Sequence, residues 1–261
     1  MRTWPQAVVA YLSLVLLYLP ALAVAIFSVN KARFGLNWKG FSWMWYQKLL
    51  ENEAIIEATL NSLILAVVST IIATVIGTAL ALGLERAPWP KSCLRLFDAI
   101  VNIPVAVPDI IMAVALVLAF SLLRNLSGIF DMGLGAMIIG HVTFQISFVT
   151  MVVRGRLASL NPQTREAAWD LFASRFYNFR RVTLPLITPG ILAGAMLAFT
   201  LSLDDFIISF FIHGPESVTL PIYIFASLKR GLTPETNALS TVMLLATVLL
   251  ALLAERITRK L

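Results

Sequence analysis

Long apolar stretches constrain this chain more than any other feature of its sequence. Six such stretches run approximately over residues 7–29, 60–84, 99–123, 134–153, 184–212 and 237–254. Each approaches the roughly 20 residues that an α-helix needs to cross about 30 Å of hydrocarbon. Because lipid offers backbone groups no hydrogen-bonding partner, these stretches are expected to be helices. The sequence therefore predicts one all-α integral membrane domain over residues 1–261, with six transmembrane helices.

The composition agrees with this fold class. Only 13% of the residues are charged, whereas soluble domains carry about 25%. The single cysteine, Cys93, excludes an intrachain disulfide and a cysteine-based metal cluster, and two histidines are too few for a histidine-rich metal site. We therefore expect neither a metal nor a cofactor bound by this chain.

The basic residues predict how the chain crosses the membrane. With the N-terminus placed inside, 13 of the 20 Lys and Arg residues fall in inner segments. The inner set is Arg2, Arg86, Lys91, Arg95, Arg154, Arg156, Arg165, Arg175, Arg180, Arg181, Arg256, Arg259 and Lys260, and the outer set is Lys31, Arg33, Lys39, Lys48, Arg124, Lys229 and Arg230. An inner excess predicts that both termini are cytoplasmic. It also attributes the net charge of +6 to topology and anionic lipid, so no nucleic acid partner is expected.

The first apolar stretch leaves one alternative open. Arg2 followed by apolar residues, with Ala21-Leu22-Ala23 near the end of the run, also fits a cleaved signal peptide. The run over 7–29 is longer than the usual apolar core of such a peptide. Because an uncleaved first span also gives an even number of helices, we expect the segment to be retained.

A polar loop over approximately 161–183 separates the fourth and fifth stretches. Asn161-Pro162 predicts the start of a short helix, since Asn caps helices and Pro suits the first turn. Small Ala167 and Ala168 allow close approach of another backbone. Glu166 and Asp170 lie four residues apart, so they share a helix face that can meet basic groups on a partner.

The residues of this loop resemble the EAA coupling loop of ATP-binding-cassette (ABC) import permeases. The matching residues are Glu166-Ala167-Ala168-Trp169-Asp170-Leu171-Phe172-Ala173, Phe176, Phe179, Val182, Leu184-Pro185 and Pro189-Gly190-Ile191. The resemblance implies a type I importer permease, in which this cytoplasmic loop between helices 4 and 5 docks into a groove on an ATPase dimer. It implies coupling roles for Glu166, Ala167, Ala168, Asp170, Leu171, Phe172 and Ala173.

The same loop has two features that bear on its geometry. Pro185 and Pro189-Gly190 are expected to break or bend the chain where the fifth span begins. Phe172 stands where the family usually has Gly, and Phe does not adopt a positive φ cheaply. Either the turn uses a different dihedral, or Phe172 fills part of the ATPase groove.

The chain is not expected to be an enzyme. No Gly-x-x-x-x-Gly-Lys-Ser/Thr phosphate loop occurs in the sequence. ATP and Mg²⁺ are therefore expected on a partner ATPase.

Three acidic residues fall within apolar stretches, where insertion of each costs roughly 2.5–3.5 kcal/mol. Asp109 lies near the middle of the third stretch, after Pro104 and Pro108, whose spacing predicts a kinked helix. Asp204 and Asp205 are adjacent in the fifth stretch. Since consecutive helical residues point about 100° apart, one aspartate is expected to face a substrate path and the other to pair elsewhere.

Unpaired acids in an internal path indicate a cationic substrate. Trp43, Trp45 and Tyr46 in the first outer loop would add cation–π contacts at the outer mouth. An interfacial aromatic belt is the alternative for these rings. Helix–helix hydrogen bonding or a proton relay is the alternative for the acids.

Two spaced pairs predict contacts between helices. His141 and Gln145 lie four residues apart in the fourth stretch and fit interhelical hydrogen bonds. Gly190 and Gly194 fit close packing of the fifth span against a neighbour, such as a sister permease.

Further segments resemble one branch of the family, the second permease subunit of spermidine/putrescine importers. They are residues 33–50, 197–205, Gly214-Pro215, Thr219-Leu220-Pro221 and 234–238, and the similarity covers nearly the whole chain. The resemblance implies substrate-path roles for Trp45, Asp109, Ser202, Asp204 and Asp205.

This resemblance also implies the assembly and its place in the cell. The partners would be a sister permease, two copies of an ATPase and a periplasmic polyamine-binding protein, in the bacterial inner membrane. The alternatives are an ABC permease for another small amine, an aminophosphonate or an organic ion, and a stand-alone proton-coupled secondary transporter.

Overall fold

The computed structural model describes residues 4–32, 37–86, 88–231 and 234–259. Arg2, Lys260 and residues 33–36, which entered the sequence arguments, lie outside the described residues. The described chain is helical, with one isolated bridge between Asn30 and Phe41. It divides into two compact units: unit 1 is Met1–Ala58 with Tyr223–Glu255, and unit 2 is Thr59–Ile222 with Arg256–Leu261.

The apolar helices agree with the all-α membrane prediction. Among the described residues, four helices are long and apolar enough to span a membrane, or five if one bent pair counts as a span. They are Gln6–Ser28, Glu53–Glu85, Leu134–Ala158 and Arg175–Asp204, with the bent pair Lys91–Ala106 and Asp109–Leu123. The count of six spans stays a prediction.

In unit 1, the Asn30 side chain holds the described residues that follow α1 (Trp4–Ser28). Besides α1, the helices of this unit are α2 (Met44–Glu51), the start of α3 (Glu53–Arg86) and most of α11 (Leu220–Arg230) and α12 (Pro234–Arg259). The Asn30 side chain accepts the N–H groups of Ala32 at 3.2 Å and Lys39 at 2.9 Å, and donates to the Asn37 carbonyl at 2.9 Å. The loop backbone therefore folds around one buried amide.

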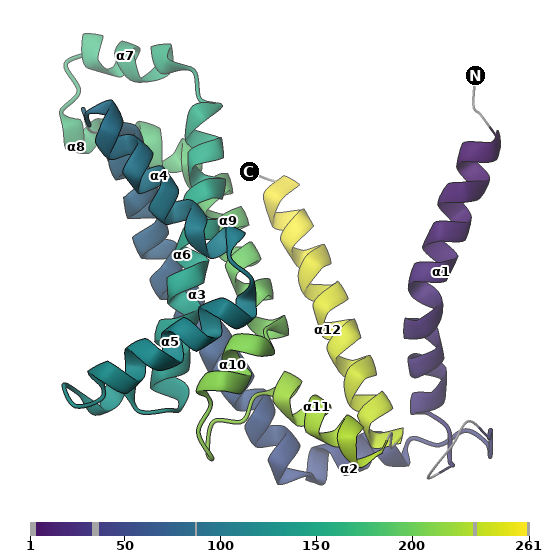
Figure 1. Cartoon of the computed structure of the whole chain (residues 1–261). Coiled ribbons are helices and arrows are strands. Elements are labelled where there is room, and N and C mark those ends of the chain that lie inside the picture. The colour runs from purple at the N-terminus through teal and green to yellow at the C-terminus, as the bar shows by residue number, and fades with distance from the viewer. Residues whose placement is uncertain (1–3, 33–36, 87, 232–233, 260–261) are drawn as a thin grey trace. The chain divides into compact units, whose positions relative to one another are not determined.

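Unit 2 is built around α6 (Leu134–Ala158), which packs along α9 (Leu184–Asp204) (Figure 1). Its main apolar cluster consists of Leu65, Ala113, Leu116, Phe120, Ala136, Met137, Phe144, Ile208 and Ile212. Arg154 of α6 donates to Glu85 at 2.9 Å and to Asp98, so one guanidinium ties α6 to α3 and to α4 (Lys91–Ala106).

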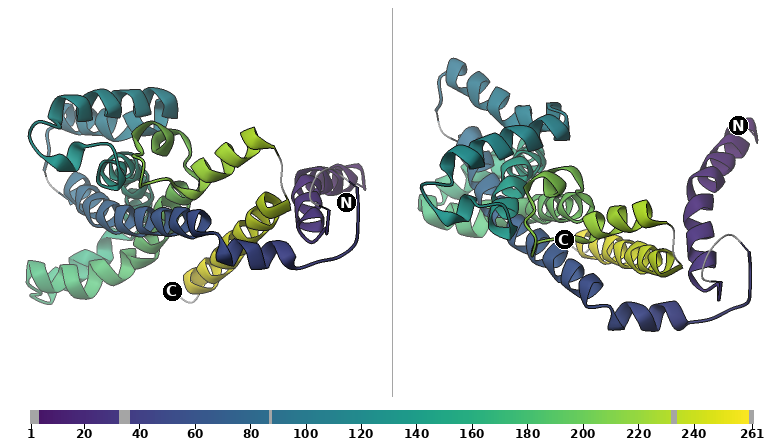
Figure 2. Two further views of the ribbon diagram at one scale, coloured as in Figure 1. Left: turned by 90° about the horizontal axis from the view of Figure 1, so that it is seen from below. Right: turned by 60° about the horizontal axis from the view of Figure 1, so that its bottom comes forward.

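The third apolar stretch is two helices, not the single kinked helix expected over 99–123. α4 and α5 (Asp109–Leu123) meet at an angle of 109° (Figure 1; right-hand view of Figure 2). Pro104 is accommodated inside α4, whereas Val107, which precedes Pro108, is extended at φ −82° and ψ 133°. The Pro108 ring disfavours a helical residue before it. Asp109 therefore begins α5, directly after the break in the middle of the bent pair.

The fifth stretch also differs from the prediction at both ends. Arg175–Asp204 is one helical segment of 30 residues that runs through Pro185 and Pro189, so neither proline breaks it. A π-helical turn over Phe179–Thr183 precedes Pro185, and its wider backbone accommodates the ring that would otherwise clash with the preceding turn. The break lies instead at Asp205, which is extended and separates α9 from α10 (Ile207–Ile212).

Glycines allow the close approach of α9 to α6. A Cβ atom added at Gly190 would lie 2.6 Å from the Arg156 Cβ, and one at Gly194 would lie 3.4 Å from the Val149 Cα. The expected close packing of Gly190 and Gly194 is therefore confirmed, and the neighbour that they contact is α6 of the same chain.

Gly190→Ala is expected to destabilise unit 2, because the Arg156 Cβ is anchored to its backbone and cannot move aside. Overpacking of this kind costs about 1–3 kcal/mol, so the melting temperature of the purified protein should fall. Gly155→Ala is the matched control, since nothing lies within 4 Å of a Cβ added in α6 at that position. Equal melting temperatures for the two variants would contradict the packing argument.

Candidate functional site

The two helix breaks of unit 2 border one pocket of about 480 Å³. Its lining residues are Pro104, Val105, Asp109, Met112, Phe144, Phe148, Leu201, Asp204, Asp205, Phe206, Ile207 and Ile208. They come from the end of α4, the start of α5, the middle of α6, the end of α9 and the start of α10. The structure thus brings together Asp109, Asp204 and Asp205, which sequence reasoning assigned to the substrate path.

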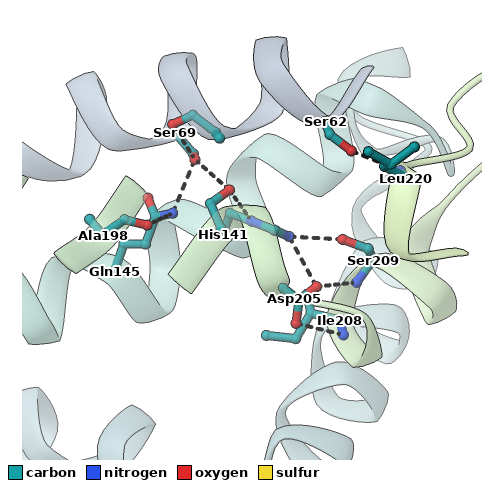
Figure 3. Close-up of polar contacts among 11 residues, drawn as sticks. Ser62, Ser69, His141, Gln145, Ala198, Asp205, Ile208, Ser209 and Leu220 are labelled. Atoms are coloured by element: carbon teal, nitrogen blue, oxygen red, sulfur yellow. Dashed lines mark hydrogen bonds and ion pairs between the residues drawn. The ribbon is translucent and has the colours of Figure 1, made fainter. Parts of the chain in front are cut away.

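The three carboxylates of the pocket differ in their surroundings. The Asp109 and Asp204 side chains are exposed. The Asp205 side chain is 9% exposed, and its oxygens accept the N–H groups of Ile208 at 3.3 Å and Ser209 at 2.8 Å (Figure 3). The expectation that one aspartate faces the path while its neighbour pairs elsewhere fits this arrangement.

A buried hydrogen-bond network lies behind Asp205 (Figure 3). His141 Nε2 is 3.3 Å from Asp205 Oδ2 and 3.1 Å from Ser209 Oγ, and His141 Nδ1 is 2.8 Å from Ser202 Oγ. Gln145 Nε2 donates to Ser69 Oγ and to the Ala198 carbonyl, both at 3.1 Å. The predicted interhelical hydrogen bonding of His141 and Gln145 is therefore confirmed.

Phenylalanine rings form part of the pocket wall, which sequence reasoning missed. Phe144 and Phe148 come from α6, and Phe206 lies in the break between α9 and α10. The available signal was helical spacing, because His141, Phe144, Gln145 and Phe148 recur at intervals of three and four on one face of α6. Among the described residues that line the pocket, none is Lys or Arg; three are acids, three are Phe and six are aliphatic residues or Pro.

Ser202 and Trp45 lie elsewhere than expected. Ser202 is 4% exposed and does not line the pocket; its hydroxyl serves the network around His141. Trp45 belongs to unit 1, is 4% exposed, and donates from Nε1 to the Asn30 carbonyl at 2.8 Å. Lys48 Nζ already lies 4.9 Å from the centroid of the Trp45 ring. Neither residue presents an open surface, and their roles in a substrate path stay predictions.

The described residues offer no metal centre. Nowhere in these parts of the chain does a group of three or more His, Cys, Asp and Glu side chains have the arrangement that could hold a metal ion. The arrangement in the pocket suits binding of an organic cation by charge and by the faces of aromatic rings.

A second candidate surface lies in the loop between α6 and α9. It carries α7 (Pro162–Asp170), in which Asn161 Oδ1 accepts the Gln163 N–H at 3.0 Å, so the predicted helix start is confirmed. In Figure 1, α7 and α8 (Arg175–Asn178) lie at the opposite end of unit 2 from α5 and α10. The Glu166 side chain lies outside the described side chains, whereas Ala167 and Asp170 are exposed and Ala168 and Ala173 are half-buried.

Phe172 adopts the conformation that sequence reasoning considered unfavourable for it. Its φ is +56°, and among the described residues other than Gly it alone has a positive φ. The Ala173 N–H bonds the Ala168 carbonyl at 3.0 Å, and the Phe172 N–H bonds the Trp169 carbonyl at 2.8 Å. These two bonds define a Schellman motif, which requires a left-handed residue at the position of Phe172. The alternative that the turn uses another dihedral is therefore wrong.

The Phe172 ring is 97% exposed, and Leu171 beside it is 81% exposed. Trp169, Phe176 and Tyr177 are also exposed along this loop. Contiguous exposed apolar side chains of this size mark interaction surfaces. We call this set of five residues the loop patch.

The fold, the acidic pocket and the exposed loop define a multi-pass membrane transport protein. The family described as binding-protein-dependent transport system inner membrane component matches residues 73–261. The chain belongs to this family, and it is an inner membrane permease subunit of an ABC transporter.

Individual relatives cover most of the chain. It is 38% identical to the spermidine/putrescine transport system permease protein PotC of Haemophilus influenzae, over 94% of this chain and 92% of that protein. It is 36% identical to the putrescine transport system permease protein PotI of Escherichia coli K12, over 92% of this chain and 85% of that protein.

Solved structures share the fold. A bacterial ABC transporter that imports the acidic polysaccharide alginate matches with a TM-score of 0.77 at 17% identity, over 98% of this chain and 94% of that one. The inward-facing MetNI methionine ABC transporter matches with a TM-score of 0.64 at 21% identity, over 80% and 98% of the two chains. At such identities the likeness concerns the fold alone.

Phe172→Gly is expected to stabilise the end of α7. A left-handed conformation costs a residue with a Cβ roughly 1–2 kcal/mol, and the greater chain entropy of Gly offsets part of the gain. With a net gain of about 1 kcal/mol, hydrogen exchange of the amides over 167–173 in the purified protein should slow about fivefold.

Leu171→Gly is the matched control for this exchange measurement. Leu171 is equally apolar and exposed, but its φ is −85°, so Gly relieves no strain there and should not slow exchange. Unchanged or faster exchange in Phe172→Gly would show that the left-handed turn is not strained in solution.

Proposed function

We propose that this chain is the permease subunit through which an ABC importer moves a polyamine, spermidine or putrescine, into the cytoplasm. The pocket carries this proposal: carboxylates beside two helix breaks and phenyl rings from α6 and Phe206 line a single space, and a flexible polycation suits both. The relatives named for polyamine transport support the same cargo.

The exposed carboxylates are the binding groups in this proposal. Asp109 begins α5 and Asp204 ends α9, so the two acids come from different helices on the pocket wall. Each would accept hydrogen bonds from one ammonium group of the substrate, while Phe144, Phe148 and Phe206 contact the methylene chain and the cation faces. Charge-assisted bonds of this kind are the strong ones in such a site.

The loop patch is the contact with the ATPase in this proposal. Its apolar side chains are exposed in the described chain and suit a hydrophobic groove on a partner protein. The helical segment Arg175–Asp204 runs from the loop to the pocket without a break, so it spans about 45 Å at 1.5 Å per residue. A displacement at its cytoplasmic end would therefore reach Asp204.

In the proposed transport cycle, the helical segment Arg175–Asp204 carries movement from the loop to the pocket. A sister permease supplies the other part of the path, a periplasmic binding protein delivers the polyamine, and an ATPase dimer binds ATP and Mg²⁺. Closing of the dimer moves α7 and tilts α9 toward an outward-open path; hydrolysis reverses the movement and releases the substrate inside. Both termini then lie in the cytoplasm, in agreement with the charge distribution of the sequence.

Asp204→Asn is expected to weaken uptake of the polyamine while the complex still assembles. Loss of one charged hydrogen-bonding partner costs about 1.5–3 kcal/mol, so KM for spermidine or putrescine should rise by tenfold or more. KM is measured from uptake of radiolabelled polyamine into vesicles that hold this chain with the sister permease, the ATPase and the binding protein. Copurification of the ATPase reports assembly.

Asp131→Asn is the control for the loss of an acid in unit 2, because Asp131 is exposed and does not line the pocket. Its KM should equal that of the wild type. If Asp204→Asn leaves uptake unchanged, the pocket does not bind the cation. Uptake of an aminophosphonate or an organic anion in place of a polyamine would reassign the cargo.

Glu166→Lys is expected to uncouple transport from ATP hydrolysis. Reversing a charge on the docking helix opposes basic groups of the ATPase, and such contacts are worth about 2–5 kcal/mol when buried. Uptake should fall more than tenfold while insertion into the membrane is unchanged, as membrane fractionation and ATPase assays would show. Thr164→Lys introduces a lysine at an exposed position of α7 without removing an acid and should have a smaller effect. Wild-type uptake in Glu166→Lys would contradict docking.

A further inference from the structure

The buried imidazole of His141 has no role in the proposed transport cycle so far. Its side chain is 0% exposed, and both ring nitrogens have polar neighbours. It comes from α6, whereas its partners Ser202, Asp205 and Ser209 lie on α9, in the break and on α10. One ring therefore connects α6 to both sides of the break at Asp205, which directly follows Asp204.

The direction of the hydrogen bonds can be deduced from the groups present. An ionised carboxylate only accepts, so the proton near Asp205 belongs to His141 Nε2. In the neutral ring, His141 Nδ1 then accepts from the Ser202 hydroxyl. Ser69 Oγ lies 3.4 Å from Ser202 Oγ and donates to the Ala66 carbonyl at 3.4 Å. Gln145 donates to Ser69. The network thus connects Gln145 to Asp205 through Ser69, Ser202 and the His141 ring, and it ends on the carboxylate.

The oxygens of Asp205 are consequently used within the protein. They accept the Ile208 and Ser209 N–H groups in addition to the His141 ring. A buried carboxylate with these donors has its charge satisfied without a ligand. The neighbouring Asp204 and the more distant Asp109 are exposed and line the same pocket, and in the described parts of the chain neither carboxylate accepts a comparable set of N–H groups.

We propose that His141 is a positioning residue of the substrate pocket: by holding Asp205, it fixes the α9–α10 break and leaves Asp109 and Asp204 as the two carboxylates that bind a cation. This inference rests on the proposed function for its substrate. It assigns Asp205 to the protein's own hydrogen bonds, although Asp205 lines the pocket. It also explains why a buried imidazole lies beside an acidic pocket that has no Lys or Arg in its described lining.

Two conservative substitutions separate positioning from a general structural role. The amide nitrogen of Gln can replace Nε2 of a histidine ring, whereas an Asn amide reaches only as far as Nδ1. His141→Gln should therefore retain the bond to Asp205 and a KM close to the wild-type value. His141→Asn should lose that bond and raise KM for spermidine or putrescine about tenfold, with Vmax changed less than about twofold. Similar KM values for the two variants would overturn the proposal.

A double-mutant cycle tests whether His141 acts through Asp205. In an Asp205→Asn background, His141→Asn should cause no further rise in KM, whereas its effect should add to that of Asp109→Asn. A full additional rise in the Asp205→Asn background would contradict the proposal. His213→Asn is the control, because the His213 ring contacts only the Phe210 carbonyl, at 2.8 Å, and the Phe210 ring among the contacts described for it.

A readout without substrate keeps this test separate from the proposed function. If the wild-type complex takes up neither spermidine nor putrescine, the proposed cargo fails, and the melting temperature of the purified complex replaces KM. His141→Asn should then melt lower than His141→Gln, and the difference should vanish in the Asp205→Asn background. A difference that persists in that background would overturn the pairing of His141 with Asp205.

Discussion

Interrupted helices in hydrocarbon are the constraint on which the architecture of unit 2 depends. Lipid supplies no hydrogen bonds, so each backbone group freed by a break must find a partner within the protein or in a cavity. One break follows α4 at Val107 and Pro108, and the other lies at Asp205. Asp205 satisfies two N–H groups at the start of α10 with its own carboxylate. Both breaks border the same pocket, since polar backbone and acidic side chains are tolerated in the same place.

Close backbone packing and buried hydrogen bonds hold α9 against α6 beside the pocket. Gly190 and Gly194 bring the α9 backbone against Arg156 and Val149 of α6. The hydrogen bonds of His141 and Gln145 also fix how α6 is oriented against its neighbours, because they link it to α9, α10 and α3. Apolar packing alone would permit small shifts in register, whereas a buried polar network is satisfied in one arrangement.

The acids of the site were predictable from the sequence, and their surroundings were only partly so. Asp109, Asp204 and Asp205 are conspicuous because ionisable residues in apolar stretches are costly. Phe144 and Phe148 do not stand out in a chain that is 59% hydrophobic, so the aromatic wall was expected at Trp43, Trp45 and Tyr46. The Trp45 ring is not available for such a wall, because it is buried and its indole N–H donates to the Asn30 carbonyl.

The prolines of the two stretches act differently for a local physical reason. Sequence reasoning assigned a kink to the third stretch at Pro104 and Pro108, and a break or bend to Pro185 and Pro189-Gly190. A proline inside a helix can be absorbed by a wider turn, as at Phe179–Thr183, whereas a residue directly before proline loses the helical conformation itself, as at Val107. At Phe172 the reasoning identified the correct position, and the tertiary geometry chose the less favourable dihedral.

By itself the sequence determined the all-helical membrane class and the short helix that begins after Asn161, and it singled out the three acids that line the pocket. These follow from apolar length, capping chemistry and the cost of charge in lipid, which are local properties of the chain. Only the tertiary structure decided that Asp109 and Asp204 share a pocket, that Asp205 is bonded internally, and that Ser202 lies behind it. Those facts depend on which helix faces meet, and that is set by packing between residues far apart in the chain.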